Sequence, residues 1–179
     1  MFQELSSKDV KFDKDEDGDD VEIGIGSMGT VFRGKYQTTI PVAVKKIRPG
    51  LPDISGVEKE LKMYGLLQHP KIIRLYGYYS KNSRLHLPVV LELGRQDLRS
   101  YLESQPGDGL PFSKALAFSQ DIAEGLAFLH GKDIIHLDIK SSNVILCEGD
   151  VMKITDFGTA RKMIGTATQS TLGKSGRGR

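Results

Sequence analysis

The sequence predicts an α+β fold of two lobes, in which a β-rich lobe with one helix is followed by a helical lobe. Between residues 21 and 93, short runs rich in β-branched and aromatic residues are broken by glycines, which is typical of strands joined by tight turns. After Gly94, apolar residues recur at helical spacing over longer segments. We therefore expect the chain to pass from one lobe to the other near Gly94.

The first lobe is predicted to contain strands at residues 21–26, 30–36, 40–47, 71–79 and 84–93. Its helix lies within residues 52–70, where Asp53 or Ser55 can cap the start and Pro70 prevents continuation. The second lobe is predicted to contain helices at 96–104 and 112–132, with Gly131 at the end of the longer one. On that longer helix the predicted apolar stripe consists of Leu116, Ala123, Leu126 and Leu129 or His130. Short strands at 143–147 and 151–155 flank a turn.

Both ends of the chain have a different composition from the part between them. Residues 1–20 are polar and are predicted to be flexible, and residues 162–179 are rich in Gly, Ser and Thr and are predicted to be disordered. The predicted division is therefore an acidic segment at 1–20, a first lobe at 21–93, a second lobe at 94–161 and a basic tail at 162–179.

Composition favours a soluble protein of the cytoplasm. The net charge of +2 gives no reason to expect nucleic acid or a membrane surface as a partner. No stretch approaches the roughly 20 apolar residues that span a bilayer, and the N-terminus lacks a signal-peptide core. The single cysteine, Cys147, lies in an apolar run, which favours a buried thiol in a reducing compartment.

The acidic run at residues 13–18 matches the first half of an EF-hand calcium loop. Position 12 of that loop would be Gly24 in place of the bidentate glutamate, and no helices flank it. A solvated acidic linker is the better interpretation.

Three glycines, Gly24, Gly26 and Gly29, are spaced as G-x-G-x-x-G and are followed by Val31. The same spacing serves dinucleotide-binding folds, but there a helix follows, whereas the residues after Gly29 predict a strand. This favours a glycine hairpin whose backbone N–H groups approach phosphates closely. A plain glycine-rich turn is the alternative.

Further along the chain, charged residues and one asparagine stand at positions suited to phosphoryl transfer. Lys45 on a predicted strand can direct its ammonium at a phosphate, and Glu60 on the predicted helix is its candidate ion-pair partner. Asp138 can accept the proton of an attacking hydroxyl, and Lys140 can offset charge on the transferred group. Asn143 and Asp156 supply the oxygen ligands that a hard divalent cation prefers.

With these motifs in this order, the segment from about Val21 to Arg161 resembles a eukaryotic protein kinase catalytic domain. The resemblance implies a two-lobed kinase fold, ATP and Mg²⁺ as cofactors and protein hydroxyls as acceptors. It implies that Val31 and Ala43 cover the adenine from above and Ile145 from below, with Leu91 as gatekeeper and Glu92 and Leu93 offering backbone hydrogen bonds. It also implies a stack of side chains linking the lobes, made of Tyr64, Leu75, His136 and Phe157.

Lys140, two residues after Asp138, resembles serine/threonine kinases more than tyrosine kinases. Residues 134–140 are similar to Mos-type kinases, while residues 75–79 and 154–160 are shared with tyrosine-kinase-like and mixed-lineage kinases. The finer subfamily stays open.

Two departures from the family pattern matter. Leu137 stands where many members carry an arginine that clamps a phosphorylated activation loop, so that mode of regulation is expected to be absent. The A-P-E motif is missing, so we expect a C-terminally truncated domain with an incomplete helical lobe. Two hypotheses follow, an ATP-dependent serine/threonine kinase or a non-catalytic ATP-binding or interaction module. An exposed core of the second lobe would also make chaperones partners.

Overall fold

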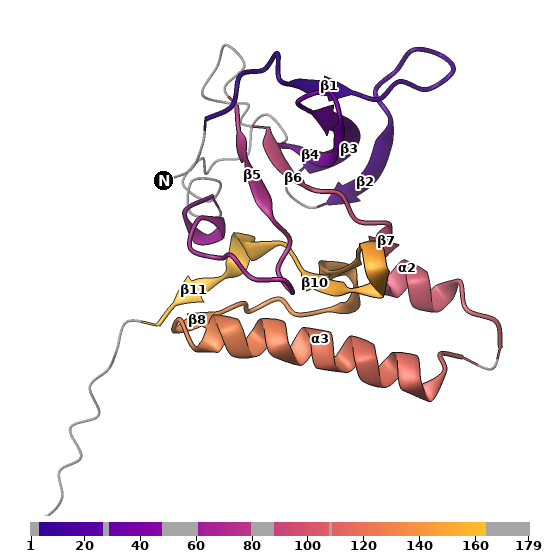
Figure 1. The fold of residues 1–179 in the computed structure, drawn as a ribbon, viewed down its shortest axis with the longest axis vertical. Coiled ribbons are helices and arrows are strands. Elements are labelled where there is room, and N and C mark those ends of the chain that lie inside the picture. The colour runs from indigo at the N-terminus through magenta and orange to yellow at the C-terminus, as the bar shows by residue number, and fades with distance from the viewer. Residues whose placement is uncertain (1–3, 27–28, 48–60, 80–87, 108, 164–179) are drawn as a thin grey trace, which may run out of the picture.

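The computed structural model describes residues 4–26, 29–47, 61–79, 88–107 and 109–163. In these residues the chain forms a β-sheet lobe above a lobe built on one long helix, as the sequence predicts (Figure 1). The α+β fold class is therefore confirmed.

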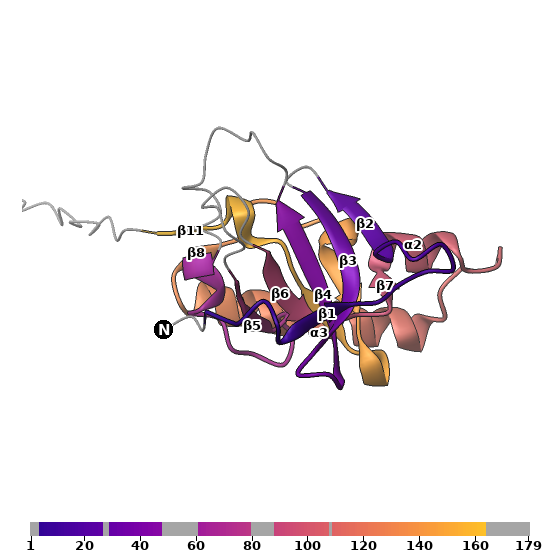
Figure 2. The ribbon, with the colours of Figure 1, turned by 90° about the horizontal axis from the view of Figure 1, so that it is seen from above.

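The large sheet contains β1 (Val10–Phe12), β2 (Glu22–Gly26), β3 (Gly29–Tyr36), β4 (Ile40–Ile47), β5 (Leu75–Tyr78) and β6 (Val89–Glu92). The strand order is β1-β3-β4-β6-β5, and β2 also pairs with β3 (Figure 2). All the pairings within this sheet are antiparallel. Alternation along β4 gives the sheet two faces, because Val42 and Val44 join one apolar cluster and Ala43 joins the other.

The expectation that residues 1–20 are flexible is wrong for the described residues 4–20. β1 pairs with β3, and the Leu5 N–H donates to the Tyr78 carbonyl at 2.7 Å on the opposite edge of the sheet. Leu5 and Val10 are buried against Val42 and Val44. This segment therefore covers the outer face of the sheet, because that face is apolar and would otherwise meet water.

The acidic loop after β1 is held by cations of the sheet. Asp13 pairs with Arg33 at 2.8 Å, and Asp20 pairs with Lys46 at 2.8 Å. The Lys46 ammonium also lies 4.1 Å from the ring centroids of both Phe12 and Phe32. The carboxylates at both ends of this loop thus bind lysine and arginine of the protein itself.

Within the helix predicted at 52–70, residues 61–64 are helical, whereas residues 65–70 are described and are not, so the predicted helix extends too far at its end. Residues 48–60 lie outside the described residues. The strand predicted at 71–79 is shorter in the structure, as β5, and the described part of the strand predicted at 84–93 contains β6. Residues 71–73 instead run along β10 (Met152–Ile154), where the Ile73 N–H donates to the Ile154 carbonyl and the Ile154 N–H donates to the Lys71 carbonyl. This contact joins the two lobes.

The second lobe begins with β7 (Gln96–Asp97) and α2 (Leu98–Glu103), whose first turn is capped by Asp97. α3 (Phe112–His130) follows, and the remaining elements are short: β8 (Ile134–Ile135), β9 (Val144–Leu146), β10, β11 (Arg161–Lys162) and three single turns of 3-10 helix at Ser141–Asn143, Glu148–Asp150 and Phe157–Thr159. β10, β9 and β7 form one small sheet, and β11 pairs with β8 in another. Residues 164–179, most of the predicted disordered tail, lie outside the described residues.

The predicted apolar stripe of α3 is wrong at two of its positions. Phe118, Gly125 and Leu129 are the buried residues of this helix, whereas Leu116 is 58 % exposed and Ala123 is also exposed. Phe112 is 82 % exposed on the helix as well. So many residues of α3 are apolar that the sequence allows more than one stripe, and contacts with β10 select the one that is buried. In the described part of the chain, no helix has the length and apolar content needed to cross a membrane.

Candidate functional site

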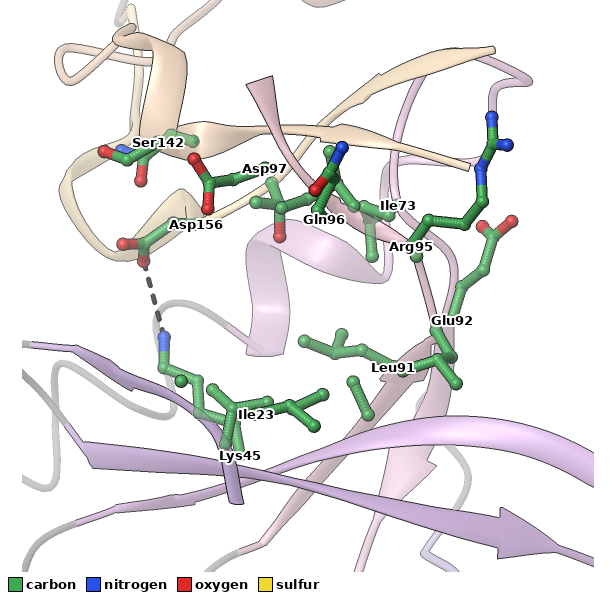
Figure 3. Close-up of a pocket in the computed structure, with 18 of the residues that line it drawn as sticks. Ile23, Lys45, Ile73, Leu91, Glu92, Arg95, Gln96, Asp97, Ser142 and Asp156 are labelled. Carbon is green, nitrogen blue, oxygen red and sulfur yellow. Dashed lines mark hydrogen bonds and ion pairs between the residues drawn. The ribbon is translucent and has the colours of Figure 1, made fainter. Parts of the chain in front are cut away.

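A pocket of about 790 Å³ opens between the large sheet and the second lobe, within the size range of small-molecule sites. Figure 3 shows it with side chains from both lobes pointing into it. The predicted site residues that line it are Gly24, Gly29, Val31, Ala43, Lys45, Leu91, Glu92, Leu93, Asn143, Ile145 and Asp156. Residues far apart in the sequence are thus brought to one cavity.

The apolar end of the pocket is formed by strands of both lobes. Val31 and Ala43 come from the sheet above, and Ile145 comes from β9 below. Gly94 makes this end possible, since a Cβ at Gly94 would lie 2.0 Å from Cγ2 of Ile145. Only a residue without a side chain lets the segment between the lobes pass so close to β9.

The segment that joins the lobes is fixed by Glu92. Its N–H donates to the Arg74 carbonyl at 2.9 Å, so the backbone group that it can offer to a ligand is its carbonyl. Its carboxylate accepts a hydrogen bond from Lys153 at 2.5 Å and one from the Arg74 N–H at 3.2 Å. Glu92 therefore ties the last strand of the sheet to β10 in the second lobe.

The polar end of the pocket contains Lys45 and Asp156, which face each other across the two lobes (Figure 3). Lys45 Nζ lies 3.4 Å from Oδ1 of Asp156, and the lysine side chain is only 12 % exposed. The strand register places Lys45 opposite Val31 on one side and Val89 on the other. Glu60, the predicted partner of Lys45, lies outside the described residues.

Asp138 is held by two neighbours on its own loop. Lys140 Nζ donates to Oδ2 of Asp138 at 2.8 Å, and Asn143 Nδ2 donates to the Asp138 carbonyl at 2.8 Å and to Oδ2 at 3.0 Å. These contacts, the Lys140 hydrogen bond first, hold the pKa of Asp138 below its usual value. Asp138 is therefore ionised and oriented, as a proton acceptor must be.

Three rings connect the lobes behind the polar end. Phe157 lies edge to face with Tyr64 at 4.9 Å between centroids and with His136 at 5.0 Å. Leu75 packs against the apolar cluster that contains Tyr64 and Phe157. The structure thus places three members of the predicted stack in contact and the fourth, Leu75, on the same cluster.

The residues at the polar end fit a phosphate group with a divalent cation. Asn143 uses its Nδ2 on Asp138, which leaves its carbonyl oxygen for a cation, and Asp156 adds a carboxylate. Lys45 adds a positive charge beside them. Gly24 and Gly29 line the same pocket, while the residues between Gly26 and Gly29 lie outside the described part.

Sequence reasoning did not identify several of the residues that line the pocket. These are Ile23, Ile25, Arg33, Ile73, Arg95, Gln96, Asp97, Ser100, Ser142 and Thr155. The position of Ile23, directly before Gly24, could have suggested a place on the roof of the pocket. Asp97 could have been identified as the helix cap that follows the join between the lobes.

Comparison with known proteins agrees with this geometry. The family profile of the protein kinase domain matches residues 19–176. Tyrosine-protein kinase FRK of Homo sapiens is 32 % identical over 140 residues, which cover 78 % of this chain and 27 % of that protein. The chain thus spans about a quarter of the length of this relative. Since the match extends over nearly all of both lobes, the chain belongs to the protein kinase family.

Proposed function

We propose that this chain binds ATP with Mg²⁺ in the pocket and transfers the terminal phosphoryl group to serine or threonine hydroxyls of proteins. The observation that carries the proposal is the contact of Asp138 with both Lys140 and Asn143. It supplies an ionised, oriented carboxylate on the loop whose Asn143 also lines the pocket that contains Lys45 and Asp156.

In the proposed step, the substrate hydroxyl oxygen forms a bond to the terminal phosphorus of ATP. The bond from that phosphorus to the bridging oxygen of the β-phosphate breaks, and ADP leaves. The hydroxyl proton passes to the Asp138 carboxylate, and Lys140 offsets the negative charge on the transferred group. Lys45 places its charge beside the phosphates.

Asn143 and Asp156 are the residues proposed to hold Mg²⁺, which would neutralise phosphate charge when bound. Val31, Ala43, Leu91 and Ile145 are proposed to enclose the adenine, and Glu92 and Leu93 to meet its edge through backbone groups. The glycines Gly24, Gly26 and Gly29 are proposed to cover the phosphates.

Lys140 supports serine and threonine over tyrosine as the acceptor, because a lysine two residues after Asp138 resembles the loop of serine/threonine kinases. The name of the human relative describes a tyrosine kinase, which favours the opposite assignment. Phosphoamino-acid analysis after reaction with a peptide library that offers all three hydroxyls decides between them. Phosphotyrosine as the main product would contradict the proposal.

Leu137 bears on regulation. Its side chain carries no charge, its residue is 57 % exposed and its backbone is left-handed, with φ at 66°. We therefore propose that no phosphorylated residue is clamped here. Leu137→Arg should make turnover sensitive to phosphatase treatment, whereas the unchanged chain should keep its activity after the same treatment.

A non-catalytic module that binds ATP or another protein is the second candidate, and the exposed Phe112 and Leu116 of α3 favour it. Such a surface would bind partner proteins or chaperones in the cytoplasm, where Cys147 stays reduced. Turnover that falls at least about 100-fold in both Lys45→Met and Asp138→Asn supports the kinase. Thermal stabilisation by ATP and Mg²⁺ without any phosphoryl transfer supports the module.

A further inference from the structure

The hydroxyl of Tyr64 contacts the main chain of Asp156. Tyr64 ends the described helical residues 61–64 and is 2 % exposed. Its Oη accepts a hydrogen bond from the Asp156 N–H at 3.1 Å and lies 3.1 Å from Oγ1 of Thr155. The ring stack with Phe157 does not require this hydroxyl, since a phenylalanine ring would pack in the same way.

The contact is made at a residue with a left-handed backbone. Asp156 has φ at 64° and ψ at 72°, a left-handed conformation that residues other than glycine rarely adopt. Such conformations persist only where the surrounding structure holds them. The preceding residue, Thr155, is held from the second lobe, since its carbonyl meets His136 Nε2 at 2.9 Å and its N–H donates to the Asn143 carbonyl.

Tyr64 holds the same turn from the first lobe. Without the phenol oxygen, the Asp156 N–H would lose its acceptor in a part-buried position beside Tyr64 and Phe157, which are both buried. An N–H that is largely withdrawn from water and has no partner is costly, so we expect the Asp156 backbone to rotate until this donor reaches water. That rotation would carry the carboxylate away from Lys45.

We propose that Tyr64 is a positioning residue, whose hydroxyl fixes the Asp156 main chain so that the carboxylate is held ready for the cation that accompanies the nucleotide. The part of this inference that concerns the cation rests on the proposed function. The part that concerns the Asp156 backbone rests only on its hydrogen bond to the Tyr64 hydroxyl. It makes cation binding depend on the helical residues that end at Tyr64.

The test compares Tyr64→Phe with the unchanged 179-residue chain. Tyr79→Phe is the matched control, because Tyr79 is equally buried but belongs to the apolar cluster on the outer face of the sheet. The first measurement is hydrogen exchange of the Asp156 amide by NMR, relative to amides of β3 and β4. The second is the affinity for ADP by calorimetry, with Mg²⁺ and with EDTA.

In Tyr64→Phe, the hydrogen-exchange rate of the Asp156 amide should be about tenfold higher, as expected when a hydrogen bond of ordinary strength is lost. Its affinity for ADP in EDTA should match that of the unchanged chain, while the gain in affinity from Mg²⁺ should fall about fivefold or more. Tyr79→Phe should change neither quantity. If Tyr64→Phe does not fold, Thr155→Val removes the oxygen that meets the same hydroxyl and should lower the Mg²⁺-dependent gain in the same direction.

Unchanged exchange at Asp156, or an unchanged gain from Mg²⁺ in Tyr64→Phe, overturns the inference. If the unchanged chain binds ADP equally well with Mg²⁺ and with EDTA, the proposed binding of Mg²⁺ in the pocket is wrong. The proposal that Tyr64 positions Asp156 for a cation is then wrong too. The exchange measurement still decides whether the hydroxyl holds the Asp156 backbone.

Discussion

The imidazole of His69 and the ring of Phe128 stack across the two lobes, with centroids 4.5 Å apart and planes inclined by 21°. Two residues later, Lys71 forms an ion pair with Asp121 of α3, and the same carboxylate accepts the Met152 N–H at 2.8 Å. The segment after the first helix is thus attached both to α3 and to β10, the strand that leads to Asp156. These attachments fix the positions of the two lobes, which form the two sides of the pocket, relative to each other.

The Lys71–Asp121 pair should therefore matter more than an ion pair on the surface. Asp121→Ala leaves a mostly buried ammonium and the Met152 N–H without their acceptor, so we expect a loss of about 2–4 kcal/mol in the free energy of unfolding. Glu103→Ala, which removes the exposed i,i+4 pair with Arg99, should cost much less, because solvent screens that pair. Urea unfolding of both variants measures the difference, and equal losses would contradict the structural role of Asp121.

Gly94 gives a prediction for the pocket itself. A methyl group at this position would lie 2.0 Å from Ile145 Cγ2 and 3.2 Å from the Leu146 carbonyl, so Ile145, which lines the pocket, must move. We expect it to move into the space proposed for adenine. Gly94→Ala should weaken ADP binding about tenfold or more, measured by calorimetry. Gly107→Ala is the control, since a Cβ there meets nothing within 4 Å. Equal affinities in the two variants would show that Ile145 yields without entering the pocket.

The strands around the glycine residues and the long helix could be predicted because their patterns are local. Runs of β-branched residues and the glycines of β2 and β3 determine these elements over short stretches of sequence. The segment that contains Leu5 and Val10 could not be predicted, because two isolated apolar residues in a polar stretch have no periodicity. Their burial depends on the apolar outer face of a sheet that is assembled from residues much later in the chain.

In the candidate site, too, some features could be predicted from the sequence and others could not. Lys45, Asp138 and Asp156 could be identified from their spacing, because phosphoryl transfer needs these residue types in this order. The hydrogen bond between the Tyr64 hydroxyl and Asp156 joins residues 92 positions apart, and no sequence pattern records it. The sequence indicates Tyr64 as a member of an apolar stack, whereas the additional role of its oxygen becomes visible only in three dimensions.

The lowered pKa of Asp20 leads to a prediction of how the stability of the folded protein depends on pH. The hydrogen bond of Asp20 with Lys46, the largest cause, lowers its pKa in the folded protein, despite the opposing effect of burial. A depressed carboxylate pKa stabilises the folded state above the unfolded value of about 3.9, and this contribution disappears as the pH falls through the folded value. Asp20→Asn should therefore be less stable than the unchanged chain at pH 7, and the difference should shrink below about pH 4.

Unfolding free energies of both proteins between about pH 7 and pH 3 provide the measurement. Lys46→Met is the matched background, because in it Asp20 has lost its main partner. In the Lys46→Met background, Asp20→Asn should change the free energy of unfolding at neutral pH much less than it does in the unchanged chain. If the difference between the unchanged chain and Asp20→Asn does not depend on pH, the effect belongs to packing instead of charge.

The last prediction concerns the proton acceptor. Lys140 is the main cause of the depressed pKa of Asp138, so Lys140→Met should raise that pKa toward its usual value. Because Asp138 accepts a proton only when ionised, the acid limb of turnover should move to higher pH in the variant. Carbon NMR of the Asp138 carboxyl follows the same titration without requiring turnover. Lys132→Met serves as the control, since Lys132 lies over the Phe128 ring.

Added salt separates the charge of Lys140 from its other effects on Asp138. It should raise the Asp138 pKa in the unchanged chain, because this ion pair is exposed to solvent and is screened. In Lys140→Met the same salt should change the pKa little. A carboxyl titration that is the same with and without Lys140 would mean that Asn143 alone sets the ionisation of Asp138.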